Sequence, residues 1–153
     1  MNLSNLQSLI SDPEVLGAVA SLNPTEESFL PCLTQLQKQF DSDLAKAALE
    51  TAILRKKAQT KFSRADSMFF TRAGLEMASG EIISRYRAKR FAKFDRVADL
   101  CCGIGGDSIG FASISNPQSL ISVDLDPLHL ALAKLNLAAY DARADFIQAD
   151  LIK

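Results

Sequence analysis

Residues 97–112 read VADLCCGIGGDSIGFA, a short apolar run that leads into closely spaced glycines and then into a helical pattern. Glycine lets a backbone bend sharply and approach a ligand closely, and the first turn of a helix presents unpaired N–H groups. The stretch therefore predicts a strand, a glycine turn at Gly103, Gly105 and Gly106, and a helix, with a ligand site at the turn.

The chain after this stretch continues the same alternation. Residues 118–126, QSLISVDLD, form a second apolar run, and residues 127–140 have helical spacing after Asp126, the expected N-cap, and Pro127. Residues 144–151, ADFIQADL, predict a third strand. Strands that alternate with helices over short links predict a right-handed parallel β-α-β-α-β unit, so the expected fold class is α/β.

The part of the chain before this unit reads as helices. Asp12 and Asn23 each precede a proline and are candidate N-caps, and Asp41 or Asp43 is a third candidate. The sequence therefore predicts two regions, a helical N-terminal region over 1–92 and an α/β half-domain over 93–153.

Composition indicates a globular protein of ordinary type, with 48% hydrophobic and 23% charged residues. The three cysteines, Cys32, Cys101 and Cys102, have no repeated spacing, which argues against a disulfide framework. His129 is the single histidine, so no histidine-based metal site is expected, and we expect this side chain to face solvent. No apolar run approaches the length of a membrane span, and we expect a soluble cytoplasmic protein without a membrane partner.

Basic residues gather between Arg55 and Arg96, where twelve Lys and Arg stand against four acids. Most such runs are solvated helix faces. Cationic side chains close to a ligand site could instead bind the phosphates of a nucleic acid. The candidate substrate-binding residues are Arg85, Arg87, Lys89 and Arg90.

Two acids near the turn bear on the nucleotide that it could bind, and Asp99 is the one that decides between the kinds of cofactor. Asp124 lies 19 residues beyond Gly105, a position where a carboxylate can accept hydrogen bonds from the ribose hydroxyls. Gly103-x-Gly105-x-x-Ser108 nearly matches a dinucleotide fingerprint, but Asp99 at the mouth of the strand would repel a diphosphate. The same carboxylate would attract a positively charged ligand. Asp99 therefore favours S-adenosylmethionine as the cofactor, and a nicotinamide-dependent oxidoreductase is the weaker alternative.

The motifs VADLCCGIGG, VDLDP and ADFIQADL resemble those of class I S-adenosylmethionine-dependent methyltransferases. The cysteine-glycine-x-glycine-glycine loop and the Asp-x-Asp-Pro signature are most similar to the group around trimethylguanosine synthase. Residues 61–91 also resemble the segment before that loop in bacterial methyltransferases with a THUMP-like domain. The resemblance implies a Rossmann-like sheet, S-adenosylmethionine as cofactor and methyl transfer, with RNA as the expected substrate and partner.

The resemblance also implies roles for individual positions. Asp99 would face the methionine ammonium group through water, Asp124 would hold the ribose, and the other cofactor-binding residues would be Cys101, Gly103, Gly105, Leu125 and Asp150. Leu125 would pack on the adenine and Asp150 would accept from its amino group. Cys101 departs from the glycine that is commoner at its position. Asp107 could complement the helix dipole or contact the cofactor, and the sequence leaves both interpretations open.

The chain ends at Lys153, three residues after Asp150. The resemblance implies that a fourth strand and an Asn/Asp-Pro-Pro-aromatic loop would follow in the family, so catalytic residues are not assigned. We expect an N-terminal fragment that is inactive alone and could self-associate through the unpaired edge of its first strand. The alternative function is a non-catalytic binding or regulatory module whose cofactor loop is vestigial.

Overall fold

The computed structural model describes residues 1–115 and 119–152. The chain forms two compact units, Met1–Lys57 and Ala58–Lys153. The sequence predicts a division after residue 92. In the structure the helices between 58 and 92 lie in the same compact unit as the sheet.

The first unit is helical. Its elements are α1 (Leu3–Ser11), α2 (Glu14–Leu22), α3 (Phe29–Leu36) and α4 (Ser42–Ala58). Leu6 and Leu9 are buried on the apolar stripe of α1, and the Asn2 side chain caps this helix by accepting from the Asn5 N–H. Asp41 caps α4 by accepting from the N–H groups of Asp43 and Leu44.

Two of the predicted helix starts in this unit are wrong. Asp12 follows the end of α1, and α2 begins at Glu14 without a side-chain cap. Asn23 ends α2 in the left-handed conformation, with φ 49°, and its N–H donates to the Ala20 carbonyl oxygen. Asparagine tolerates this conformation, so an Asn-Pro pair can follow a helix as readily as precede one. The next helix, α3, starts only at Phe29.

The second unit contains all three strands. Its helical elements are η1 (Ala65–Ser67), α5 (Arg72–Met77), α6 (Glu81–Ala88), η2 (Lys89–Phe91), α7 (Gly106–Ser115) and α8 (Pro127–Ala138). The Thr71 hydroxyl caps α5 by accepting from the Gly74 N–H at 2.9 Å. Asp126 caps α8 by accepting from the Leu128 N–H at 2.8 Å, as the sequence predicts.

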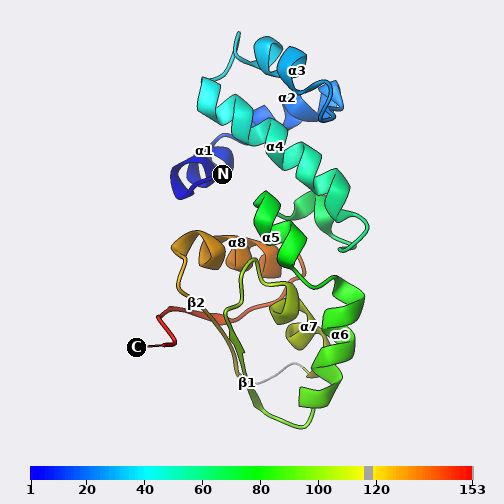
Figure 1. The fold of residues 1–153 in the computed structure, drawn as a ribbon, viewed down its shortest axis with the longest axis vertical. Coiled ribbons are helices and arrows are strands. Elements are labelled where there is room, and N and C mark those ends of the chain that lie inside the picture. The colour runs from blue at the N-terminus through cyan, green and yellow to red at the C-terminus, as the bar shows by residue number, and fades with distance from the viewer. Residues whose placement is uncertain (116–118, 153) are drawn as a thin grey trace. The chain divides into compact units, whose positions relative to one another are not determined.

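The sheet is parallel, with strand order β1 (Arg96–Leu100), β2 (Ser119–Asp124), β3 (Asp145–Gln148). The connections from β1 to β2 and from β2 to β3 both move along the sheet in the same direction. Because such connections are right-handed, α7 and α8 lie on the same face of the sheet, where they contact each other (Figure 1). Asp99 pairs with Ser122, which places both side chains on this face. The predicted β-α-β-α-β arrangement after a helical region is confirmed.

The topology determines where a ligand can bind. All three strands run in parallel, so the carboxyl ends of β1 and β2 meet at one edge of the sheet, together with the start of α7. In the described part of the chain, β1 has a partner strand only on its β2 side. Of the helices described, none combines the length and the apolar character needed to cross a membrane.

Candidate functional site

The loop between β1 and α7 depends on three residues with positive φ. Cys101, Gly103 and Gly105 have φ of 62°, 54° and 85°. A Cβ on Gly105 would lie 3.2 Å from the Ala133 Cα, so this glycine also permits the close approach of α8. A Cβ on Gly103 would meet nothing within 4 Å. Gly103 therefore leaves open space beside the loop, and Cys101 adopts a conformation that favours glycine.

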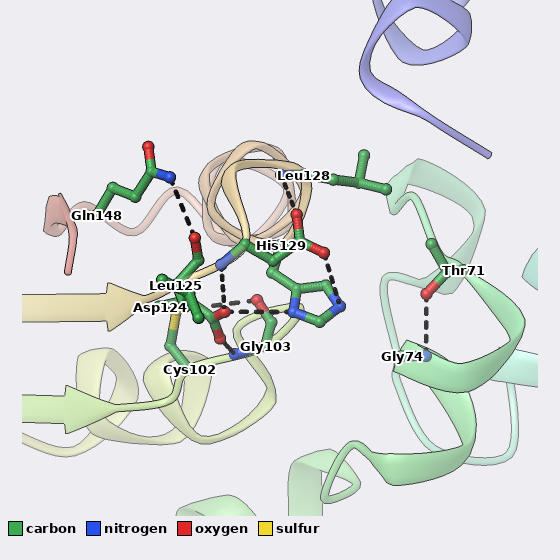
Figure 2. A network of polar contacts seen from close by, with 10 residues as sticks. Thr71, Gly74, Cys102, Gly103, Asp124, Leu125, Leu128, His129 and Gln148 are labelled. Atoms are coloured by element: carbon green, nitrogen blue, oxygen red, sulfur yellow. Dashed lines mark hydrogen bonds and ion pairs between the residues drawn. The ribbon is translucent and has the colours of Figure 1, made fainter. Parts of the chain in front are cut away.

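Asp124, at the end of β2, joins that strand to the loop. Its Oδ2 accepts from the Gly103 N–H at 2.8 Å, and its Oδ1 accepts from the Asp126 N–H at 2.9 Å (Figure 2). Burial acts to raise the pKa of Asp124, but the two backbone hydrogen bonds and the neighbouring His129 outweigh it and lower this pKa. Asp124 is therefore a carboxylate at neutral pH.

His129 lies beside this carboxylate instead of facing open solvent. Its Nδ1 is 3.4 Å from Asp124 Oδ1 and its Nε2 is 3.9 Å from Asp126 Oδ2 (Figure 2). The side chain is 33% exposed. The structure corrects the prediction that His129 faces solvent. Helix α8 starts directly after β2, so the first turn of the helix brings His129 back over the end of this strand.

Asp99 lies beneath the loop and its carboxylate turns toward α7. The Ser108 hydroxyl donates to Asp99 Oδ2 at 2.5 Å, and the oxygens of Ser108 and Ser122 are 2.9 Å apart. Burial raises the pKa of Asp99, the nearby charge of Asp107 adds to the rise, and the hydrogen bond from Ser108 opposes it. The ionised form of Asp99 is therefore disfavoured relative to an exposed aspartate.

A cavity of about 200 Å³ opens where the loop meets α5 and the start of α7. Its walls come from three parts of the second unit, and its lining residues are Ala73, Gly74, Met77, Ala78, Ser79, Cys101, Cys102, Gly103, Ile104, Gly106, Asp107 and His129.

The structure brings only some of the predicted cofactor residues to this cavity. Cys101 and Gly103 line it, and Asp124 adjoins it through its contacts with Gly103 and His129. Leu125 is 62% exposed and Asp150 is exposed beyond the end of β3. Asp99 and Gly105 do not line the cavity, because Asp99 is buried against Ser108 and Gly105 packs against α8.

The α5 wall and His129 are site residues that sequence reasoning missed. Residues 73–79 precede the loop by more than twenty positions, and those that line the cavity are uncharged and mostly small, since Glu76 is not among them. Asn136 on α8 brings the two parts together, because its side chain bonds to the backbone of Phe69 and to the Ile104 carbonyl oxygen at 2.8–3.0 Å. Asn136, between Leu135 and Leu137 on a helix whose other polar residues are His129 and Lys134, was the signal available in the sequence.

Asp107 is the acidic side chain among the residues that line the cavity. Its Oδ2 accepts from Arg87 Nη1, and the same nitrogen donates to the Ser79 hydroxyl at 3.2 Å. Its Oδ1 is buried and has no hydrogen-bond partner within the described part of the chain. Arg87 therefore joins the Asp107 carboxylate to Ser79, and Asp107 and Ser79 both line the cavity.

The four predicted substrate-binding residues differ in their surroundings. Arg85 pairs with Glu81 at 2.7 Å, and Arg87 pairs with Asp107. Lys89 and Arg90 are exposed in η2. All four residues are exposed, and two of them, Arg85 and Arg87, are ion-paired with acids of the protein.

Comparisons with protein families match the two units separately. Residues 94–153 match the model of the RNA cap guanine-N2 methyltransferase family, and residues 3–58 match a domain of unknown function.

Among curated proteins, an uncharacterised S-adenosylmethionine-dependent methyltransferase of Mycobacterium tuberculosis, matched in two strains, is 32% identical over 117 residues. That alignment covers 72% of this chain and 32% of the relative, so the chain spans about a third of the length of the curated relatives it matches. A solved structure described as a methyltransferase from Porphyromonas gingivalis W83 superimposes with a TM-score of 0.60 at 17% identity, over 82% of this chain and 35% of that one. The fold is that of Rossmann-like methyltransferases.

Proposed function

We propose that this chain forms the cofactor-binding part of an S-adenosylmethionine-dependent methyltransferase that acts on RNA. The observation that carries the proposal is the 2.8 Å contact between the Gly103 N–H and the Asp124 carboxylate, which we propose as the ligand of the ribose beside an open glycine loop. The names of the curated relatives and of the matched family support the same activity.

The residues present fit this cofactor on the evidence of the site itself. Gly103 has no atom within 4 Å of its missing Cβ, so a ligand can lie against the loop backbone. Asp124 stays ionised and can accept from the ribose hydroxyls through lone pairs that its two backbone donors leave free.

The remaining roles follow from position. S-adenosylmethionine supplies a methyl group on a positively charged sulfur, which a nucleophile of the substrate can attack. Leu125 is exposed directly after the strand end and offers an apolar surface to the adenine, and Asp150 follows β3 nearby in the sheet order. The α5 helix contributes a further part of the cavity wall through Ala73, Gly74 and Met77. The contribution of the chain is therefore to hold and orient the cofactor.

Support for an RNA substrate comes from the exposed cations beyond α6. Lys89 and Arg90 are exposed in η2, and the Tyr86 ring is 64% exposed between them and the cavity end of α6. Cations bind phosphates without sequence preference and an exposed ring can stack on a base. Arg85 and Arg87 take a smaller part, because each is paired with an acid of the protein.

The cofactor half of the proposal is tested by thermal unfolding of the full-length protein with S-adenosylhomocysteine, with NAD and without ligand. We expect stabilisation by S-adenosylhomocysteine alone. Stabilisation by NAD would favour an oxidoreductase, and stabilisation by neither ligand would favour a binding module with a vestigial loop.

The substrate half is tested by transfer of a labelled methyl group from S-adenosylmethionine to RNA, to DNA and to protein from the same extract. We expect label in RNA, and we expect Lys89→Ala with Arg90→Ala to weaken RNA binding and flatten its salt dependence. Label in protein or in a small molecule alone would contradict an RNA substrate. A control variant, Lys134→Ala on α8, should leave RNA binding unchanged.

A further inference from the structure

Helix α5 is too short to hold its own position in the cavity wall. It has six residues, and helices of this length are not stable by themselves. Its place therefore depends on contacts at its two ends. The Thr71 hydroxyl caps the first turn by accepting from the Gly74 N–H (Figure 2), and the side chain of Lys61 caps the last turn.

The ammonium group of Lys61 is fully engaged at the end of α5. Its Nζ donates to the backbone oxygen of Leu75 at 2.7 Å and to those of Glu76 and Ala78 at 3.1 Å each. The last carbonyls of a helix have no partner within the helix, and the helix dipole favours a cation beside them. An ammonium group has three donors, and here each has its own carbonyl.

The main chain of the same residue holds the start of α6. The Lys61 carbonyl oxygen accepts from the Glu81 N–H at 2.8 Å, and the Glu81 carboxylate accepts from the Ser63 N–H at 2.8 Å. Residues 61–63 therefore hold both sides of the turn formed by residues 78–80, which joins α5 to α6.

This turn belongs to the wall of the cavity. Met77, Ala78 and Ser79 line it, whereas Lys61 does not. A Cβ on Gly106 would lie 3.0 Å from the Ser79 carbonyl oxygen, so the turn lies directly against the start of α7. A shift of the turn therefore changes the space between α5 and the glycine loop.

We infer that Lys61 is a positioning residue for the cofactor, because its hydrogen bonds to the end of α5 fix the width of the cavity between the 78–80 turn and the glycine loop. The inference rests on the proposed function, since this cavity is where we place the cofactor. The alternative is that Lys61 only stabilises the fold. A positioning role predicts lost affinity in a variant that stays folded, whereas a purely stabilising contact predicts none, because affinity falls through unfolding only when the folded fraction drops.

The test is calorimetric titration of S-adenosylhomocysteine into the full-length protein and its Lys61 variants, with urea unfolding of each to measure the folded fraction. Lys61→Met removes the donors and keeps an unbranched side chain, and Lys61→Arg keeps the charge and several donors. We expect Lys61→Met to weaken binding by about tenfold or more, and Lys61→Arg to weaken it by about threefold or less. Lys61→Gln, which keeps an uncharged amide donor, is the milder variant if Lys61→Met does not fold, and it should weaken binding by about threefold or more.

Two controls separate position from stability. Val97→Ala removes buried volume near the amino end of β1, away from α5, so it should destabilise the second unit and leave the affinity unchanged. Lys134→Met removes an exposed lysine of α8 and should change neither the stability nor the affinity strongly.

The outcomes distinguish the inference from the proposed function. Unchanged affinity in folded Lys61→Met, or an equal loss of affinity in Val97→Ala, would overturn the positioning role. Binding by Lys61→Arg as weak as that by Lys61→Met would overturn the capping of α5 as its cause. Absence of S-adenosylhomocysteine binding by the folded unsubstituted protein would overturn the proposed function, and the inference with it.

Discussion

The Asp124 carboxylate lies 2.8 Å from the backbone nitrogen of Gly103 and thereby joins the end of β2 to the turn after β1. The two residues are 21 positions apart in the chain. The contact orders the loop and directs the acid at the same time, so the residue proposed to hold the ribose also shapes the wall beside it. Stability of the loop and affinity for a nucleoside are therefore coupled at this one side chain.

Alanine at the two loop glycines should separate folding from binding. Gly103→Ala carries the cost of a positive φ, about 1 kcal/mol, and meets no neighbour, so the protein should fold but lose S-adenosylhomocysteine affinity. Gly105→Ala carries the same cost of a positive φ, and its new Cβ would also lie 3.2 Å from the Ala133 backbone. The Gly105→Ala protein should therefore unfold at a lower urea concentration. Urea unfolding and ligand titration measure the two effects. Equal losses of stability would contradict this description of the loop.

Asp99→Asn should change the dependence of stability on pH. The folded-state pKa of Asp99 is raised above the usual value of 3.8, chiefly by burial. Its contribution to stability is therefore complete below about pH 4 and is lost as the pH rises through the folded pKa. Asparagine cannot ionise, so the stability of Asp99→Asn relative to the unsubstituted protein should improve from acid to neutral pH.

Urea unfolding between acid and neutral pH measures this trend. For Ser108→Ala we expect the opposite trend, a relative stability that falls as the pH rises. Removing the Ser108 hydroxyl takes away a hydrogen bond that lowers the Asp99 pKa, so Ser108→Ala should destabilise more at neutral pH than in acid. A constant difference between Asp99→Asn and the unsubstituted protein at every pH would argue against a buried, ionisable Asp99.

The adjacent cysteines should react differently with a thiol reagent. Cys101 is exposed and lines the cavity, whereas Cys102 is buried and burial raises its pKa to about 12. N-ethylmaleimide should therefore label Cys101 faster than Cys102, because the thiolate is the reacting form. Bound S-adenosylhomocysteine should slow this labelling, which mass spectrometry of the digested protein can follow. Labelling that is insensitive to saturating ligand would place the ligand elsewhere.

Asn136→Leu should destabilise the second unit strongly. The substitution removes the side-chain hydrogen bonds to the Phe69 N–H and to the carbonyl oxygens of Phe69 and Ile104, which are part-buried at Phe69 and buried at Ile104. Each such loss costs about 1–3 kcal/mol, so the free energy of unfolding should fall by about 3 kcal/mol or more. Gln148→Leu, which removes one exposed hydrogen bond to Leu125, should change it by less than about 1 kcal/mol. Similar effects of the two substitutions would contradict the bridging role of Asn136.

Local chemistry determined the elements that the sequence predicted correctly. The glycine turn after Leu100 and the Asp126-Pro127 pair have conformational requirements that few other contexts satisfy, and both lie where expected. Asn23-Pro24 failed because asparagine can end a helix in the left-handed region as well as cap the next one. Local signals of this kind are ambiguous where two helices are close together.

The site was predicted only as far as neighbouring strand ends determine it. Asp124 lies at the loop because the carboxyl ends of parallel strands meet at one edge of the sheet. The cavity wall formed by α5 and the Arg87–Asp107 ion pair depend on how α5 and α6 pack beside α7. No sequence motif in α5 or α6 predicts that packing. The division of the chain after Lys57 has the same cause, since the helices before the sheet carry no signal of which unit they join.

The most direct test of the account is a calorimetric titration of S-adenosylmethionine into the full-length protein and into Asp124→Ala. The account predicts saturable binding at one site, weakened by more than about tenfold in the variant, since the ribose contact and the ordered loop are lost together. Absence of binding in a folded protein, or equal affinity in Asp124→Ala, would contradict it.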